Sequence, residues 1–160
     1  ALYSESKLVA VRYPRGAQRA IPESIKPTFA DFDVFGDENA EKAIVTYGRT
    51  FSACAFAYEK LVNSGESVKL IKLNRIIPVC EGAVEAAKNC KDVYFFEEGI
   101  RRGGAGEGFL FDLSKAGFSG KYHLRAIENG FVKQASVESL LHKYGFDEEG
   151  VLSFVTSAEA

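Results

Sequence analysis

Two arginines near the start of this 160-residue chain have the type and spacing of an anion site. Arg12 and Arg15 flank Tyr13-Pro14, follow a valine-rich run and precede Gly16. Arginine presents planar, paired donors that suit a phosphate or a carboxylate, and a Pro-Gly turn would hold them in place. The same pair also suits a salt bridge across a domain interface. On the spacing alone, we prefer the salt bridge to the ligand site.

Two adjacent carboxylates, Glu97 and Glu98, follow an aromatic strand pattern. Side chains alternate along a strand, so one of the pair must point inward or toward the next element. A buried carboxylate there could cap a helix that opens near Gly104, pair with Arg101 or Arg102, or act as an acid or base. We prefer the capping interpretation.

A glycine-rich turn follows, with Gly103, Gly104, Gly106 and Gly108. Glycines permit close backbone approach, and a helix N-terminus can hold an anion. The spacing matches neither G-x-G-x-x-G nor a Walker loop. We therefore expect the turn to pack against a neighbouring domain or subunit.

The histidines and cysteines do not form a metal-binding pattern. His123 and His142 have no partner at ligand spacing, and no C-x-x-C pair is present. We expect structural or solvated histidines. The three scattered cysteines, Cys54, Cys80 and Cys90, are expected to be buried, reduced thiols of a cytoplasmic protein.

Composition indicates a globular protein with one domain and some additional material. The net charge of −2 gives no support for nucleic-acid or membrane binding. No apolar run approaches the ~20 residues that cross a bilayer, and no signal peptide is recognisable. The sequence contains no methionine, so we expect that residue 1 is not the natural start.

Strand and helix patterns alternate from residue 42 onward, which predicts an α/β fold. We expect a mostly parallel, mixed sheet of about five strands with helices on both faces. The expected strands are 7–13, 43–47, 68–73, 93–96 and 122–127, with a short edge strand at 32–35. The first expected helix begins after Thr50 as its N-cap, and the second covers 79–89 and starts at Pro78. A third helix follows the glycine turn, and two more close the chain at 136–144 and 147–157. Ligands bind beyond the carboxyl ends of such strands, where Arg49, Asn74-Arg75, Glu97-Glu98 and Glu128 lie.

Several motifs occur in the order found at the end of one enzyme family. They are the Arg12–Gly16 turn, Glu97-Glu98, the Gly103–Gly106 turn, residues 131–135 and residues 144–147. Together they resemble the C-terminal portion of the 1-deoxy-D-xylulose-5-phosphate synthase family, which are transketolase-like thiamine diphosphate enzymes.

The resemblance implies a division of the chain and a reaction. Residues 1–16 would end the pyrimidine-binding domain, 17–40 would form a linker, and 41–160 would form a transketolase-type C-terminal domain. The family condenses pyruvate with glyceraldehyde 3-phosphate and releases carbon dioxide, using thiamine diphosphate and Mg²⁺. The cofactor motifs are absent here, so we expect this fragment to bind neither group and to be inactive alone. Its expected partners are the N-terminal and pyrimidine-binding domains of the same protein, a second copy in a homodimer, and a small phosphate substrate.

The resemblance also assigns acceptor-phosphate binding to Arg12 and Arg15, with a second position at Asn74 or Arg75. The family pattern Arg-Phe-x-x-Pro reads Asn74-Arg75-Ile-Ile-Pro78 here, so its arginine falls on Asn74. A one-residue offset in a strand would turn Arg75 to the other face. The alternatives are the β chain of a transketolase or 2-oxoacid dehydrogenase, and a noncatalytic α/β interaction module.

Overall fold

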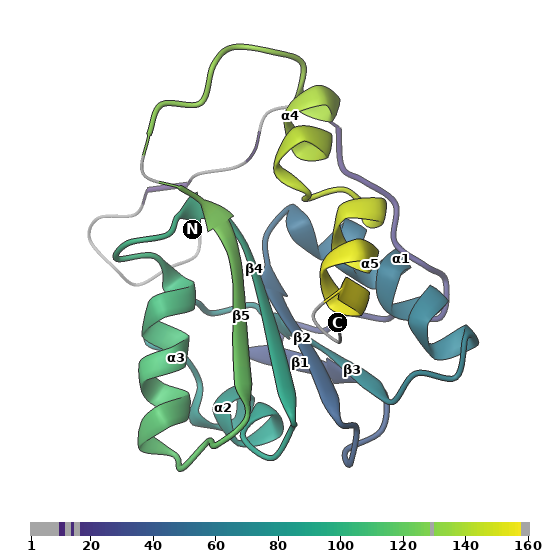
Figure 1. The fold of residues 1–160 in the computed structure, drawn as a ribbon, viewed down its shortest axis with the longest axis vertical. Coiled ribbons are helices and arrows are strands. Elements are labelled where there is room, and N and C mark those ends of the chain that lie inside the picture. The colour runs from purple at the N-terminus through teal and green to yellow at the C-terminus, as the bar shows by residue number, and fades with distance from the viewer. Residues whose placement is uncertain (1–9, 12–13, 15–16, 129, 158–160) are drawn as a thin grey trace.

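A five-stranded mixed sheet forms the centre of the molecule (Figure 1). The structure is a computed structural model that describes residues 10–11, 14, 17–128 and 130–157. The strand order is β1-β3-β2-β4-β5, with β1 antiparallel and the others parallel. The strands are β1 Phe32–Phe35, β2 Lys42–Tyr47, β3 Val68–Leu73, β4 Asp92–Ile100 and β5 Lys121–Ile127. The expected fold class and the edge strand are confirmed, while the expected strand at 7–13 falls mostly outside the described residues.

Helices cover both faces of the sheet (Figure 1). One face carries α1 and α5, the other carries α2 and α3, and α4 lies beyond the end of β5. The helices are α1 Thr50–Asn63, α2 Glu81–Ala87, α3 Ala105–Lys115, α4 Val137–Tyr144 and α5 Glu148–Ser157. Within the described part of the chain, no helix is long and apolar enough to cross a membrane.

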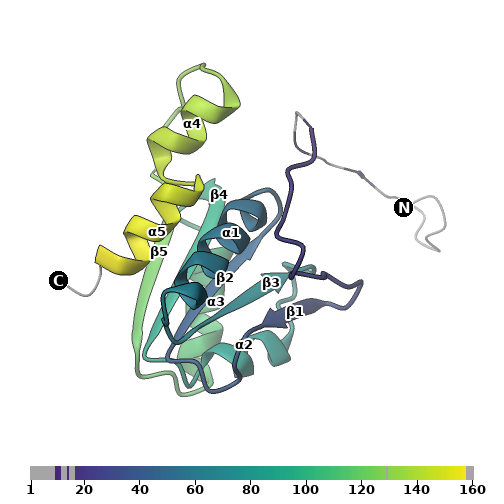
Figure 2. The ribbon, with the colours of Figure 1, turned by 90° about the vertical axis from the view of Figure 1, so that its right-hand side faces the viewer.

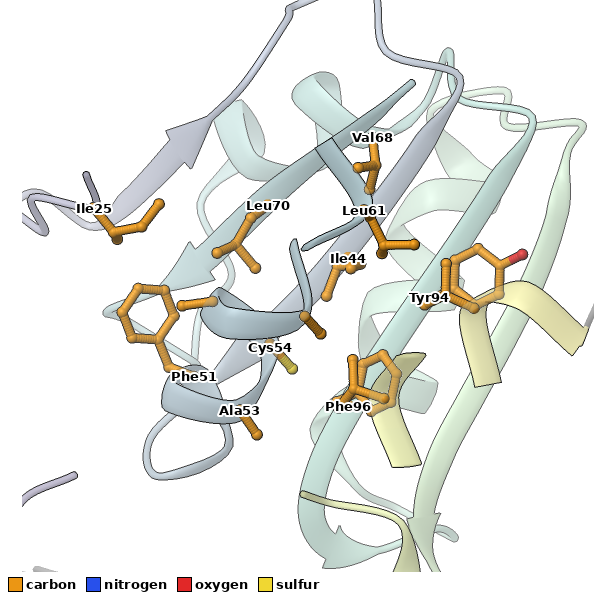
Figure 3. Packing of buried hydrophobic residues seen from close by; sticks show 14 residues of the cluster. Ile25, Ile44, Phe51, Ala53, Cys54, Leu61, Val68, Leu70, Tyr94 and Phe96 are labelled. Carbon is orange, nitrogen blue, oxygen red and sulfur yellow. The ribbon is translucent and has the colours of Figure 1, made fainter. Parts of the chain in front are cut away.

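The first core lies between the sheet and α1 with α5. Ile44, Leu70 and Phe96 point from three strands toward Cys54 and Leu61 of α1 (Figure 3). Parallel strands covered on both faces must be apolar on both sides, which accounts for the continuous apolar run from Ala43 to Val45 in β2.

The second core lies between the sheet and α2 with α3. Phe95 belongs to this core while its neighbour Phe96 belongs to the first, as the alternation of a strand requires. The Phe95 and Phe109 rings lie 5.4 Å apart, and Phe109 and Leu113 of α3 are completely buried. Leu110, between them in the helix, is 38% exposed.

Strand β4 is longer than expected. The sequence predicted an end at Phe96, but the strand continues to Ile100. The register with β5 shifts between Phe96 and Ile100, so the strand passes through an irregularity. Glu97 and Glu98 therefore lie within a strand and point to opposite faces.

Helix α2 begins later than expected. Pro78 was expected in its first turn, but the Ile77–Pro78 peptide bond is cis and the helix begins at Glu81. Pro78 therefore belongs to the turn that connects β3 to this helix. Cys80 is the N-cap residue.

Side chains cap the last two helices. The Ser136 hydroxyl accepts a hydrogen bond from the Ser139 N–H, and Asp147 Oδ1 accepts one from the Gly150 N–H at 2.9 Å. Gly145 follows α4 with φ 69°, a left-handed conformation that suits glycine.

Phe109 and Phe111 offer a matched test of the second core, because both belong to α3. Phe109→Ala should lower the free energy of unfolding by about 3–5 kcal/mol, the cost of truncating a buried aromatic ring. Phe111 is 64% exposed, so Phe111→Ala should change it by less than about 0.5 kcal/mol. Urea denaturation followed by circular dichroism measures both. Equal losses in the two variants would contradict the assigned face of α3.

Candidate functional site

The candidate site lies where the parallel strands end. We call this edge of the sheet the carboxyl edge. β2 ends at Tyr47, Gly48 turns the chain with φ 61°, and α1 begins at Thr50. Thr50 was expected to be the N-cap, and this is wrong because it is the first helical residue. Its hydroxyl donates to the Tyr47 carbonyl at 2.7 Å instead of accepting from a helix N–H. Arg49 occupies the cap position without a side-chain capping bond.

Glu97 is buried at the carboxyl edge and caps helix α3. Its side chain is on the α3 face, is 1% exposed, and accepts hydrogen bonds from the Ala105 N–H at 3.0 Å and the Gly106 N–H at 3.1 Å. The Tyr47 hydroxyl donates a third bond at 3.0 Å. Burial together with the Glu97 charge raises the pKa of Tyr47. The capping prediction is confirmed, and an external anion does not have access to these two amides.

The glycine turn is shaped by this carboxylate. A Cβ on Gly104 would lie 2.5 Å from Glu97 Oε1 and 2.4 Å from the Ile100 carbonyl oxygen. A Cβ on Gly106 would lie 2.4 Å from a methyl carbon of Leu124. These two glycines therefore allow α3 to approach β4 and β5 closely.

Glu98 points to the opposite face and pairs with Arg49. The Arg49 Nε donates to Glu98 Oε2 at 3.0 Å, and Nη2 contacts Oε1. This paired arrangement gives the ion pair a defined direction. It links the end of β4 to the start of α1.

A basic pocket, which we call the Lys72 pocket, lies between the first segment of the chain and α1. Residues 17–31 run beside α1 before the chain enters β1 (Figure 2), and the Ser52 hydroxyl donates to the Ala20 carbonyl. The cavity is about 570 Å³. Its lining includes Pro14, Arg19, Gly48, Arg49, Phe51 and Lys72. None of the described lining residues is acidic.

Each cation of this pocket has a different environment. Arg49 is held by Glu98, and Arg19 Nη2 lies 3.5 Å from Glu138 Oε1. Lys72 Nζ lies 5.3 Å from the centre of the Phe51 ring and hydrogen-bonds to Asn74 Oδ1. Among the described residues, Lys72 forms no ion pair. The pocket therefore carries a positive charge that a small anion would offset.

Asn74 and Arg75 lie in the turn after β3, not within the strand. Both backbone N–H groups donate to the Asp31 carbonyl at 2.9 Å. The expected reversal of face between the two residues does not apply, because strand alternation ends at Leu73. Arg75 pairs with the Asp31 carboxylate at 2.6 Å.

The Asn74 side chain fastens this turn to β1. Its amide donates to the Ala30 carbonyl at 2.9 Å and to Asp33 Oδ2 at 2.8 Å. Burial acts to raise the pKa of Asp33, but hydrogen bonds from Thr28 and Asn74 and the nearby Lys72 charge lower it overall. Asn74 thus links the Asp33 carboxylate to the Lys72 ammonium.

The remaining expected anion-binding residues, Arg12 and Arg15, lie outside the described residues. Pro14 between them is described and lines the Lys72 pocket. Neither Asn74 nor Arg75 belongs to the described lining of that pocket. Sequence reasoning missed Lys72 and Arg19. The signal for Lys72 was its position as the penultimate residue of β3, beside the carboxyl edge, whereas the other lysine of this strand, Lys69, lies near its start.

The histidines have structural partners. His123 Nε2 lies 2.7 Å from Asp92 Oδ1, and its ring stacks on Tyr94 at 4.5 Å. His142 Nδ1 lies 2.7 Å from Asp147 Oδ2. Across the described ranges, no three histidine, cysteine, aspartate or glutamate side chains gather as a metal site would require.

A protein-family match covers most of the chain. Residues 36–151 match the model of the transketolase C-terminal domain. The chain belongs to this family. The match covers every strand after β1, the helices α1 to α4 and the first turn of α5.

Curated relatives share one name. The chain is 25% identical over 152 residues to the 1-deoxy-D-xylulose-5-phosphate synthase of Shouchella clausii, covering 93% of this chain and 24% of the relative. It is 29% identical over 146 residues to the same-named enzyme of Geobacillus thermodenitrificans, covering 86% and 22%. The chain thus spans about a quarter of the length of these relatives.

A solved structure supports the fold. A split-gene transketolase, described as an inactive β4 tetramer, aligns with a TM-score of 0.71 and 21% identity. The alignment covers 86% of this chain and 46% of that one. At this identity the likeness concerns the fold alone.

Glu97 and Glu98 provide a matched test of the capping assignment. Glu97→Ala removes the acceptor of two buried helix amides and should lower the free energy of unfolding by about 3 kcal/mol. Glu98→Ala breaks a partly exposed ion pair and should cost less than about 1 kcal/mol. Thermal and urea unfolding of both variants measure the difference. If Glu98→Ala cost as much as Glu97→Ala, the capping role would be wrong.

Proposed function

We propose that this chain is the C-terminal portion of a thiamine diphosphate-dependent 1-deoxy-D-xylulose-5-phosphate synthase of the cytoplasm. Such an enzyme condenses pyruvate with glyceraldehyde 3-phosphate and releases carbon dioxide. Family membership and the shared name of the relatives support the proposal. One structural observation carries the role that we assign to this chain: Pro14, between two arginines, lines a basic pocket with Arg49 and Lys72.

In this proposal the Lys72 pocket receives the phosphate of the acceptor aldehyde. A phosphate monoester carries about −1.5 to −2 charges at neutral pH, which a lysine and several arginines offset. Arg12 and Arg15 would supply paired donors from the turn around Pro14. Lys72 would supply a single ammonium from the end of β3, positioned by its bond to Asn74.

Arg75 would join the site by exchanging partners. Its side chain and that of Asp31 are each 47% exposed. An exposed ion pair of this kind contributes about 0–1 kcal/mol, so a phosphate can replace the carboxylate at low cost. Asn74 would act as a positioning residue, because its amide is already bound to Ala30 and Asp33.

Thiamine diphosphate and Mg²⁺ belong to the proposed complete enzyme. No three carboxylate, histidine or thiol side chains gather in the described part of the chain, and the proposal assigns none of its residues to Mg²⁺ or to the diphosphate. We therefore derive no step of the reaction through either group in this chain. The proposal confines the chain to acceptor binding and to contacts with other domains, and it predicts no turnover by the chain alone.

The proposed neighbours are the N-terminal and pyrimidine-binding domains and a second copy of the protein. Ile77 is 84% exposed and Phe111 is 64% exposed. Large apolar side chains of this kind suit contacts between domains or subunits. Ile77 lines the cavity between α2 and α3, together with Gly103 and Gly104.

Steady-state kinetics test the proposal in an enzyme that carries this chain together with the upstream domains. Arg12→Ala and Lys72→Gln should each raise the KM for glyceraldehyde 3-phosphate about ten- to a hundredfold, the loss expected for one charged hydrogen bond. The KM for pyruvate should stay within about twofold, because the acceptor phosphate is the only group that these residues would hold.

Lys121→Gln provides the matched control. Lys121 is exposed at the start of β5, at the opposite end of the sheet, so the same charge change should leave both KM values unaltered. An unchanged acceptor KM in Arg12→Ala and Lys72→Gln would contradict the phosphate role. Turnover with a ketose phosphate donor but not with pyruvate would contradict the synthase and assign a transketolase.

A further inference from the structure

A second basic pocket lies at the far side of the carboxyl edge, and we call it the Arg125 pocket. Its volume is about 530 Å³, and it is formed by the last residues of β5, the segment after Gly130 and the end of α4. Strand β4 separates β5 from β2 and β3 in the sheet, so this cavity is distinct from the Lys72 pocket. Neither the family match nor the curated relatives assign it a role.

The charges around this cavity do not balance. Arg101, Arg125 and Lys143 line it together with one carboxylate, Glu128. Arg101 already uses that carboxylate, since its Nε donates to Glu128 Oε1 at 2.7 Å. Among the described residues, Arg125 and Lys143 form no ion pair. About two positive charges are therefore left without an acidic partner.

Arg125 is fixed in position but incompletely hydrogen-bonded. Its guanidinium carbon lies 4.2 Å from the centre of the Phe154 ring. Nη1 makes only a long bond of 3.4 Å to the Tyr144 carbonyl, and the buried Nε has no hydrogen-bond acceptor. A buried donor without an acceptor costs about 1–3 kcal/mol. Burial, with Arg101 nearby, also lowers the pKa of Arg125.

The chain leaves room for this guanidinium at the end of α4. A Cβ on Gly145 would lie only 2.5 Å from Arg125 Nη1. A purely structural arginine at a helix C-terminus would bond the last carbonyls well. The single long bond to Tyr144 explains where Arg125 is, but it does not explain the unmatched charge or the unused donor.

We propose that the Arg125 pocket binds a small molecule through a phosphate group. The two unmatched cations suit a dianion, and a phosphate monoester approaches that charge while a single carboxylate offsets only one of them. The planar arginine donors and the lysine ammonium are the groups that hold phosphates in proteins. Phe131 and Tyr144 also line the cavity and would contact the apolar part of such a ligand.

A titration followed by ¹H–¹⁵N NMR tests this site in the 160-residue chain. Inorganic phosphate is added at constant ionic strength, with chloride as the reference salt and acetate as the carboxylate probe. The amide signals of Arg125, Lys143 and Tyr144 should shift along one saturable curve with phosphate, and acetate should bind at least about tenfold more weakly. Signals near the Lys72 pocket report separately on the other site.

Variants test whether Arg125 and Lys143 are responsible for phosphate binding. Arg125→Gln and Lys143→Gln should each weaken phosphate binding at this pocket about tenfold or more. Lys143 is exposed, so its variant should fold even if Arg125→Gln does not. Lys121→Gln removes the same charge at the other end of β5, and Lys72→Gln removes it at the other pocket. Both variants should leave the dissociation constant for phosphate at the Arg125 pocket within about twofold of its original value.

Three results would overturn the proposal. They are shifts that do not saturate, equal weakening by Lys121→Gln, and acetate binding as tight as phosphate binding. Lys72→Gln should affect only the Lys72 pocket. A failure of phosphate binding at the Arg125 pocket would therefore not contradict the proposed acceptor site, and a failure of the acceptor site would not contradict the Arg125 pocket.

Discussion

The carboxyl edge depends on one buried carboxylate, Glu97, which joins β4 to the N-terminus of α3. The Glu97 carboxylate accepts hydrogen bonds from the Ala105 and Gly106 N–H groups. These bonds stabilise the buried carboxylate and satisfy two helix donors that have no partner within the helix. Strand alternation then directs Glu98 to the opposite face, where it holds Arg49 at the start of α1. One pair of adjacent residues thereby connects the two faces of the sheet.

This arrangement separates the basic side chains of the edge into two groups. Glu97 caps α3 and Glu98 offsets only Arg49, so these two carboxylates leave Lys72 and the cations beside β5 without an acidic partner. The Lys72 pocket lies toward β2 and β3, and the Arg125 pocket lies by β5. A net charge of −2 for the whole chain conceals this local excess of positive charge. The distribution of charge along the edge is therefore more informative than its sum.

The sequence predicted the sheet, the helices on both faces and the capping role of Glu97, because these follow from periodicity and from strand alternation. It did not predict the late start of α2, since a proline is compatible with both a first helical turn and a cis turn. The predicted end of β3 at Leu73 is confirmed, so Asn74 and Arg75 follow the strand, and only the reversal of face expected between them is wrong. Lys72 was missed because the pocket is completed by Pro14 and by residues within 17–27, which are distant in sequence. The anion-binding roles of Arg12, Arg15, Asn74 and Arg75 remain predictions.

Native-state hydrogen exchange at the Ala105 and Gly106 amides tests the central claim most directly. Bonded to a carboxylate that is 1% exposed, both amides should exchange as slowly as those of β4, although they belong to the first turn of a helix. The exposed first-turn amide of Glu138 in α4 provides the internal reference for fast exchange. If Ala105 and Gly106 exchanged as fast as Glu138, Glu97 would not hold α3, and the account of the carboxyl edge would be wrong.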